Sequence, residues 1–277
     1  MKPKKNVVLI TGASSGIGKA IAGIMASKGD MVFAGARKEK DIELLDQYKN
    51  VQGIKLDVRK STDIENVIQK IKDTEGHLDC LVNNAGVMGW GAIIDRDIEY
   101  FKNIFEVNMW GTISVVKAAY PLLKKSPFYP AVFNISSQGA NYTFPFWSPY
   151  HMSKYAMEAF TGSLRHEFMS VGIRVFSIAP GAFKSEMLSK QQEELDSYEK
   201  KFQSDFSQKV VKMLRTPVKK DNQRGQSPEI IGELIYKILH SKKSKARYQP
   251  GKRLIPDVLF EKMPMPILDK IIMKAIK

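Results

Sequence analysis

Several features that would point to particular chemistries are scarce or missing in this sequence of 277 residues. It has one cysteine, Cys80, which cannot form an internal disulfide. The surrounding letters LDCLV predict a buried strand thiol and not a nucleophile, because no histidine is placed to activate it. His, Cys and acidic residues show no metal-ligand spacing, and there is no GxSxG elbow. The sequence therefore indicates neither a metal site nor a serine hydrolase.

Long apolar runs are also lacking. No segment approaches the roughly 18 consecutive apolar residues of a membrane span. The basic start MKPKK leads through a short apolar run into a glycine turn, which is typical of a first strand and not of a secretory signal. Together with the single cysteine, these features predict a globular protein in a reducing, cytoplasmic setting.

Acidic residues are too few to balance the basic ones, and the formal net charge is +14. Between Ser241 and Lys277 there are ten Lys or Arg and three acidic residues, so an excess of +7 lies in the last 37 residues. Such a bias favours anionic partners: nucleic acid, lipid or cofactor. No finger cysteines or aromatic RNA-binding platform accompany the charge. We therefore expect no nucleic-acid partner and interpret most of these lysines as a solvated surface.

The sequence does contain a regular alternation of strand-like and helical segments. Segments of 3.6-residue periodicity separate short, fully apolar runs, which is typical of a parallel sheet covered on both faces. This pattern predicts an α/β, doubly wound fold in one domain of residues 1–277. The expected strands are Asn6–Thr11, Met31–Gly35, Gly53–Val58, Leu78–Asn84, Ala131–Ser137 and Ile173–Pro180, with a last short strand in RYQPG.

A glycine-rich turn follows the first strand and opens the first helix. In TGASSGIG, Gly12, Gly16 and Gly18 allow a tight turn, close approach of a pyrophosphate, and packing of helix on strand. The second strand ends in Ala36 and Arg37. An enzyme that prefers NAD(H) usually has an Asp or Glu at this place to hold the ribose hydroxyls. Because a guanidinium can pair with a 2′-phosphate, NADP(H) is predicted to be preferred, with NAD(H) possible.

These and later motifs, in their order, resemble the short-chain dehydrogenase/reductase family over about residues 5–250, nearest its hydroxysteroid and retinol dehydrogenase-like branch. TGASSGIG resembles the family's TGxxxGxG turn, NNAG its sheet-supporting segment, YHMSK its YxxxK pair and APGAFKS its PGxxxT/S segment. The resemblance implies a Rossmann-type fold and an enzyme that acts on CH–OH groups with NAD(P). The cofactor-binding residues that it implies are Gly12, Ser14, Ser15, Gly16, Ile17, Gly18, Arg37, Asp57, Val58, Asn84, Ala85, Gly86, Tyr150, Lys154, Pro180, Gly181 and Ser185.

The resemblance also implies four catalytic residues: Asn108, Ser137, Tyr150 and Lys154. Tyr150 and Lys154 share a helix face. The Lys154 ammonium and the positive charge of oxidised nicotinamide both favour the phenolate, so Tyr150 can act as a general acid/base. By resemblance, Lys154 also binds the nicotinamide ribose, Ser137 holds the substrate oxygen and Asn108 anchors a proton-relay water. His151 is expected to point elsewhere, in a packing or surface role. A catalytically idle dinucleotide-binding sensor or scaffold is the alternative, and retention of Ser, Tyr and Lys argues against it.

Bulky apolar residues flank the expected site and predict a lipophilic alcohol or ketone as substrate. The expected contacts are Ser137, Tyr150, Met88, Phe144 and Phe183, although core or oligomer packing explains the apolar ones equally well.

Two segments outside the sheet pattern have separate interpretations. Residues of about 183–224 carry a charged helical pattern and predict a substrate lid. The basic tail, about 251–277, aligns isoleucines on one helical face. It is expected to pack on its own domain or in a homo-oligomer (dimer or tetramer), with contact to an anionic membrane surface as the alternative.

Overall fold

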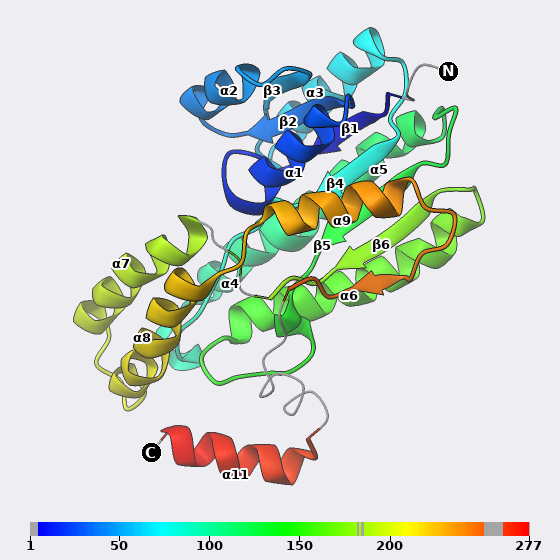
Figure 1. Cartoon of the computed structure of the whole chain (residues 1–277). Coiled ribbons are helices and arrows are strands. Elements are labelled where there is room, and N and C mark those ends of the chain that lie inside the picture. The colour runs from blue at the N-terminus through cyan, green and yellow to red at the C-terminus, as the bar shows by residue number, and fades with distance from the viewer. Residues whose placement is uncertain (1–4, 182, 184–185, 252–262, 277) are drawn as a thin grey trace.

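A seven-stranded parallel sheet forms the centre of the protein (Figure 1). The computed structural model describes residues 5–181, 183, 186–251 and 263–276, with the backbone alone for 186–193, 216–224 and 275–276. The strand order is β3-β2-β1-β4-β5-β6-β7, and every neighbouring pair is parallel, which confirms the predicted α/β class. The strands are β1 (Val7–Ile10), β2 (Met31–Ala36), β3 (Val51–Lys55), β4 (Cys80–Asn83), β5 (Ala131–Ile135), β6 (Arg174–Ile178) and β7 (Arg247–Tyr248).

Helices connect the strands and cover both faces of the sheet. The α-helices are α1 (Gly16–Ser27), α2 (Glu39–Asp46), α3 (Ser61–Thr74), α4 (Ile98–Phe105), α5 (Gly111–Leu123), α6 (Ser148–Met169), α7 (Glu186–Lys201), α8 (Ser207–Arg224), α9 (Glu229–Leu239) and α11 (Met265–Ile276). Two short 3-10 turns, η1 (Ile93–Asp95) and η3 (Gln138–Ala140), and a π-helical turn, η2 (Glu106–Trp110), are the other helical elements of the described residues.

The core lies in two layers because successive strand residues point to opposite faces. Val8 shares a buried cluster with Ile21 of α1 and Ile231 of α9, whereas Val7 shares another with Val115 of α5. Figure 1 shows the corresponding arrangement, with α1 and α9 on one face of the sheet and α5 and α6 on the other. Cys80 is buried in the first layer, and burial raises its pKa, so the expectation of a structural strand thiol is confirmed.

The third strand differs from its predicted span of Gly53–Val58. It runs over Val51–Lys55, and Asp57 lies in the loop that follows. The Leu56 N–H still donates to Ala36 O of β2 at 2.8 Å, and the Asp57 N–H, which points away from β2, donates to Asp63 Oδ2 of α3 at 2.9 Å. This places Asp57 beyond the carboxyl end of β3, where ligands of doubly wound sheets bind.

The segment predicted to form a lid folds into α7 and α8, which lie together at one side of the sheet (Figure 1). Their described apolar residues pack on the segment between β4 and α4 and form a third buried cluster. We call it the α7–α8 cluster: Trp90, Ala92, Leu195, Tyr198, Val210, Val211 and Leu214. Whether these helices act as a lid stays a prediction.

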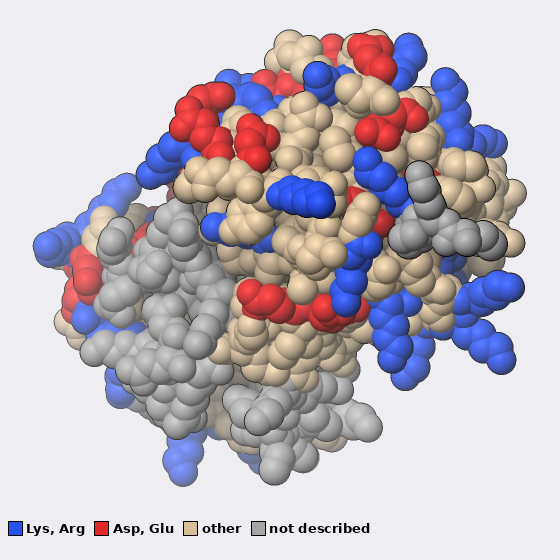
Figure 2. All heavy atoms as spheres, turned by 45° about the horizontal axis from the view of Figure 1, so that its top comes forward, with Lys and Arg blue, Asp and Glu red and all other residues tan. Residues whose placement is uncertain are grey.

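The charged surface fits the interpretation of solvated lysines. Figure 2 shows Lys and Arg side chains spread over the face in view and interspersed with acidic groups. Among the described residues, no helix is long and apolar enough to span a membrane, and no group of three or more His, Cys, Asp or Glu is arranged to hold a metal ion.

Candidate active site

Helix α6 carries the Tyr150 and Lys154 pair in its first two turns. Pro149 stands at the helix start, where its missing N–H leaves no unpaired donor. Both side chains point inward from the helix: Lys154 Nζ lies 5.7 Å from the centroid of the Tyr150 ring and donates to the backbone oxygen of Ile135 at 2.9 Å. Since Ile135 is the last residue of β5, the ammonium is fixed at the carboxyl end of the sheet.

Ser137 meets Tyr150 from the loop after β5. Ser137 caps η3, accepting from the Gly139 N–H at 3.0 Å, and its side chain is hydrogen-bonded with that of Tyr150. The structure thus brings together the three residues that the sequence predicted to act jointly.

The ionisation of the pair differs from the expectation that Lys154 lowers the pKa of Tyr150. For the chain alone, burial raises the pKa of Tyr150, and the hydrogen bond with Ser137 offsets this only in part. Burial also lowers the pKa of Lys154 to about 8, which the carboxylate of Glu158 opposes. Desolvation disfavours both charged forms, so the predicted lowering is not a property of the protein's own groups.

Asn108 lies in the π-helical turn between α4 and α5, a feature often found at functional sites. Its amide nitrogen donates to Val87 O and Ser153 Oγ, both at 2.9 Å, and its Oδ1 accepts from Val87 N at 2.8 Å. Both amide hydrogens are therefore used within the protein. The side chain ties the segment after NNAG to α6, which the sequence motif did not reveal.

The glycine turn has the geometry that a pyrophosphate site requires. Gly12 has a φ of +66°, and a Cβ there would lie 2.8 Å from Ala85 Cα. A Cβ at Gly18 would lie 2.5 Å from Asn84 Nδ2, which donates to Gly12 O at 2.8 Å. Asn84 and Ala85 thus buttress the turn from β4, and the turn stays close to the α1 N-terminus, whose N–H groups suit phosphate. The residues present fit a dinucleotide.

Arg59 is a residue at the adenosine end that the sequence reasoning missed. Its guanidinium donates to both carboxylate oxygens of Asp57, at 3.0 and 2.6 Å, and holds the pKa of Asp57 at about 2. Arg37 also lowers the Asp57 pKa, so its charge acts in the same region. Val58, the next residue, packs on Gly111, where a Cβ would lie 2.6 Å from Val58 Cγ2.

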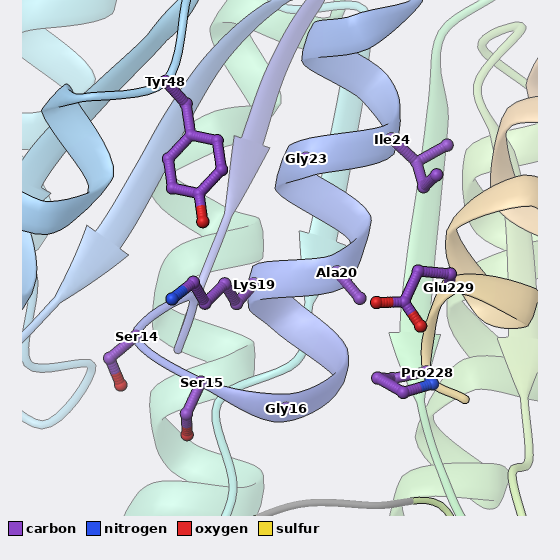
Figure 3. Close-up of a pocket in the computed structure, with 10 residues that line it drawn as sticks. All are labelled: Ser14, Ser15, Gly16, Lys19, Ala20, Gly23, Ile24, Tyr48, Pro228 and Glu229. Atoms are coloured by element: carbon purple, nitrogen blue, oxygen red, sulfur yellow. The ribbon is translucent and has the colours of Figure 1, made fainter. Parts of the chain in front are cut away.

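A shallow depression of about 420 Å³ opens outside the glycine turn (Figure 3). Ser14, Ser15 and Gly16 line one end of it, and the Lys19 side chain extends between Ser14 and Tyr48. It shares these loop residues with the expected cofactor site. The four predicted catalytic residues do not line it.

The turn after β6 approaches η3 at the nicotinamide end predicted from APGAFKS. The Gln138 N–H donates to Pro180 O at 2.9 Å, and a Cβ at Gly181 would lie 2.9 Å from Gln138 Oε1. Ser136 Oγ and Gln138 Nε2 are buried without a hydrogen-bond partner among the described residues. Two free buried polar atoms beside this turn suit a bound polar group. Ser185 lies outside the described residues.

The predicted substrate-contacting residues have different surroundings. Met88 is half-buried after the NNAG segment, and Phe144 lies in an edge contact with Tyr142, with ring centroids 5.2 Å apart. Phe183 is buried in the core layer of α1 and α9, and a Cβ at Gly251 would lie 3.2 Å from its ring. This surrounding favours core packing for Phe183 over substrate contact.

Arg96 joins α7 to the segment before α4, a contact that the sequence did not reveal. Its guanidinium pairs with Glu194 of α7 at 3.1 Å, donates to Trp90 O at 2.9 Å, and lies 4.0 Å from the Tyr100 ring centroid. Tyr100 also donates to Glu194 Oε1 at 3.0 Å. The rings of Trp90, Tyr198 and Phe202 surround the same guanidinium at 5.0 to 5.5 Å.

The comparison with known proteins agrees with this geometry. Residues 6–196 match the family described as short chain dehydrogenase. The chain belongs to the short-chain dehydrogenase/reductase family. The chain spans 62% and 54% of the length of two of the curated relatives that it matches, both named D-beta-hydroxybutyrate dehydrogenase.

Individual relatives of this short-chain dehydrogenase/reductase differ in how much of their length it spans. It is 34% identical to the mitochondrial D-beta-hydroxybutyrate dehydrogenase of Mus musculus, over 74% of this chain and 62% of that protein. It is 31% identical to the NADPH-dependent 3-dehydrocapnine reductase of Ornithobacterium rhinotracheale, over 97% of this chain and 96% of that protein. A short-chain dehydrogenase from Streptomyces avermitilis superposes with a TM-score of 0.77 at 26% identity, over 99% of this chain and 95% of that one.

The buried ammonium predicts a pH-dependent stability. Its pKa of about 8 in the folded protein lies below the ordinary value of 10.5. Below pH 8 Lys154 is charged in both the folded and the unfolded state, and its burial destabilises the fold. Between the two pKa values Lys154 has lost its proton in the folded state but keeps it in the unfolded state, so the free energy of unfolding rises with pH. The stability advantage of Lys154→Met over wild type should therefore shrink by roughly 3 kcal/mol from pH 8 to 10.5.

Urea unfolding of both proteins across this pH range measures the difference. The unpaired Ile135 carbonyl left in Lys154→Met adds a pH-independent offset, so only the slope is diagnostic. A difference that stays constant with pH would contradict burial of the ammonium.

The Arg96 contacts predict that α7 depends on one guanidinium. Arg96→Gln should lower the free energy of local opening of α7 by roughly 2 kcal/mol, because hydrogen bonds to a charged, largely buried group are lost. Amide hydrogen exchange of the α7 backbone measures it. Arg215→Gln is the matched control, since Arg215 bridges Asp196 and Glu199 on the exposed side of α7 and α8. Equal protection of α7 in both variants would contradict the assignment.

Proposed function

We propose that the protein is an NADP(H)-dependent reductase and dehydrogenase of a lipophilic compound with its oxygen at carbon 3. The single observation that carries the proposal is the convergence of Ser137, Tyr150 and Lys154 at the carboxyl end of β5. This convergence argues against the alternative of an idle dinucleotide-binding protein, because all proton-handling groups are present and in contact.

The residues divide the work as follows. A bound nicotinamide supplies or accepts the hydride. Tyr150 protonates the carbonyl oxygen during reduction and removes the hydroxyl proton during oxidation. Ser137 holds the same oxygen beside Tyr150, and the Lys154 ammonium would bind the nicotinamide ribose. Both amide hydrogens of Asn108 are used, so this residue positions Val87 and α6. A relay water would donate its hydrogen bond to the Asn108 side-chain oxygen.

The names of the relatives favour the substrate class. The bacterial relative that spans nearly the whole chain is a 3-dehydrocapnine reductase, and the mammalian one acts on a beta-hydroxy compound, so both names place the reacting oxygen at the third carbon. The half-buried Trp147, whose ring centroid lies 6.3 Å from that of Tyr150, and its neighbour Phe146 suit an apolar chain. The hydroxysteroid or retinol branch stays a prediction.

Tyr150→Phe should abolish turnover and leave NADPH affinity within about twofold, because only the proton donor is removed while the ring is kept. A panel of acetoacetate, ethyl 3-oxodecanoate and 3-dehydrocapnine, followed at the NADPH absorbance band, measures the activity. Higher kcat/KM for the longer-chain ketones is expected. Turnover by the variant at wild-type rate, or no turnover of any panel member by wild type, would remove the proposal.

The preference for NADP(H) rests on Arg37. Arg59 already neutralises Asp57, so the Arg37 guanidinium is left to pair with a 2′-phosphate, and the bacterial relative is named as NADPH-dependent. Arg37→Asp should reduce NADPH affinity at least tenfold and change NADH affinity much less, because like charges then face each other. Fluorescence titration with both cofactors measures this. An unchanged ratio of the two affinities would overturn the cofactor assignment.

The tail helix supports a membrane-peripheral setting for such substrates. In α11 only part of the apolar face is covered: Leu268 is buried, whereas Ile267 and Ile271 are 51% and 42% exposed next to the exposed Lys270 and Lys274. We expect co-sedimentation with phosphatidylcholine vesicles containing phosphatidylserine, and loss of at least half of it in Ile267→Asp/Ile271→Asp. Equal pelleting of both proteins would exclude α11 as the contact. The expected homo-oligomer stays a prediction.

A further inference from the structure

His151 is a buried titratable residue for which the proposed proton transfer has no direct use. It follows Tyr150 on α6, and its side chain is 6% exposed. Its Nδ1 is hydrogen-bonded with the backbone oxygen of Gly139 in η3. A carbonyl only accepts, so Nδ1 carries the proton. The sequence-based expectation that this ring simply packs away from the site leaves this bond unexplained.

The Gly139 residue links His151 to Ser137. While its oxygen accepts from His151, its N–H donates to Ser137 Oγ at 3.0 Å. The space is tight, because a Cβ at Gly139 would lie 3.4 Å from both His151 Nδ1 and Ser137 Oγ. The two hydrogen bonds lie on the two peptide groups that flank the Gly139 Cα, so this one residue connects the two side chains.

The Ser137 hydroxyl gains its direction from this arrangement. Since its oxygen already accepts from Gly139, its own hydrogen is free to donate to Tyr150, and the hydrogen bond between these side chains lowers the pKa of Tyr150 against the effect of burial. The other end of the loop is fixed separately, by a bond of 2.6 Å from Arg247 of β7 to Asn141 Oδ1. His151 thus holds the end of η3 that carries Ser137.

We propose that His151 is a positioning residue for catalysis: through Gly139 it orients the Ser137 hydroxyl toward Tyr150. The inference rests on the proposed function of Tyr150 as proton donor. It does not require the imidazole to titrate, and burial lowers the His151 pKa, which keeps the ring neutral. Among the described residues, the other ionisable group near Tyr150 is Lys154 on the same helix. Glu158, which is paired with Arg247, acts on Lys154.

The test uses two substitutions of nearly equal shape. His151→Leu removes the donor, whereas His151→Asn keeps an N–H near the place of Nδ1. His151→Leu should lower kcat for ethyl 3-oxodecanoate reduction about tenfold and leave the KM for NADPH unchanged. This is the size of effect expected from losing one hydrogen bond to a charged group, here the bond from Ser137 to the Tyr150 phenolate. His151→Asn should recover most of that loss. His166→Leu, at an exposed histidine further along α6, should behave as wild type.

Two further readouts separate positioning from general destabilisation. In a Ser137→Ala background, His151→Leu should cause no additional loss of kcat, because its effect passes through the missing hydroxyl. In tyrosine-labelled carbon-13 NMR with NADP⁺ bound, the Tyr150 signal, assigned with Tyr150→Phe, should titrate about one pH unit higher in His151→Leu than in wild type or His151→Asn.

The outcomes are separable. If wild type does not reduce ethyl 3-oxodecanoate or any other panel ketone, the proposed function fails, and the NMR titration still tests the link to Tyr150. If wild type is active but the losses in the double variant are additive, or the Tyr150 titration is the same in Leu and Asn variants, the positioning role is refuted. If His151→Leu fails to fold, the Tyr150 titration of two other variants decides. An unshifted titration in His151→Asn together with an upward shift in Ser137→Ala supports the positioning role, and any other result refutes it.

Discussion

The hydrogen bond from Lys154 Nζ to the Ile135 carbonyl is the contact on which the site depends. It joins the last residue of β5 to the second turn of α6, and so fixes the helix at the edge of the sheet where the loops after β1, β4 and β5 meet. Lys154 is 6% exposed, and desolvation of a charge opposes burial. Burial moves its pKa down to about 8, an effect that the Glu158 carboxylate opposes, and the residue is still mainly a cation at neutral pH.

Each loop around that contact is held through its backbone. Asn108 binds both the N–H and the C=O of Val87, Asn84 binds the carbonyl of Gly12, and His151 binds the carbonyl of Gly139. Side-chain amides and an imidazole serve this purpose because they bond to peptide groups at fixed geometry without adding charge to a buried site. The consequence is a site whose loops are each tied to a neighbouring element by side-chain hydrogen bonds, an arrangement that favours preorganised chemistry.

The parts of this structure that follow from local pattern could be predicted from the sequence. Fully apolar strands and the glycine turn depend on neighbours along the chain, and the spacing of Tyr150 and Lys154 on one helix face needs only the helical repeat. The pairing of Arg96 with Glu194 could not be predicted, because 98 residues separate them and the contact exists only once α7 packs on the segment before α4. The end of β3 was misplaced because the apolar pattern alone does not show that pairing with β2 stops at Ala36 and Lys55.

Electrostatic behaviour was the least predictable property. Residue types suggested that the ammonium acidifies the phenol, yet burial dominates for both groups in the folded chain. Burial depends on what covers the pair, and Trp147, with its ring centroid 6.3 Å from that of Tyr150, is one of the covering groups. It packs against the α7–α8 cluster, and its neighbour Phe146 has a φ of +70°, a costly conformation for a residue with a bulky side chain. The Phe146 carbonyl accepts from Gly91 N–H at 2.7 Å, and Gly91 borders Arg96. The short aromatic segment before α6 thus contacts both the Tyr150 ring and the α7–α8 cluster, so the surroundings of the acid/base are coupled to how α7 and α8 pack.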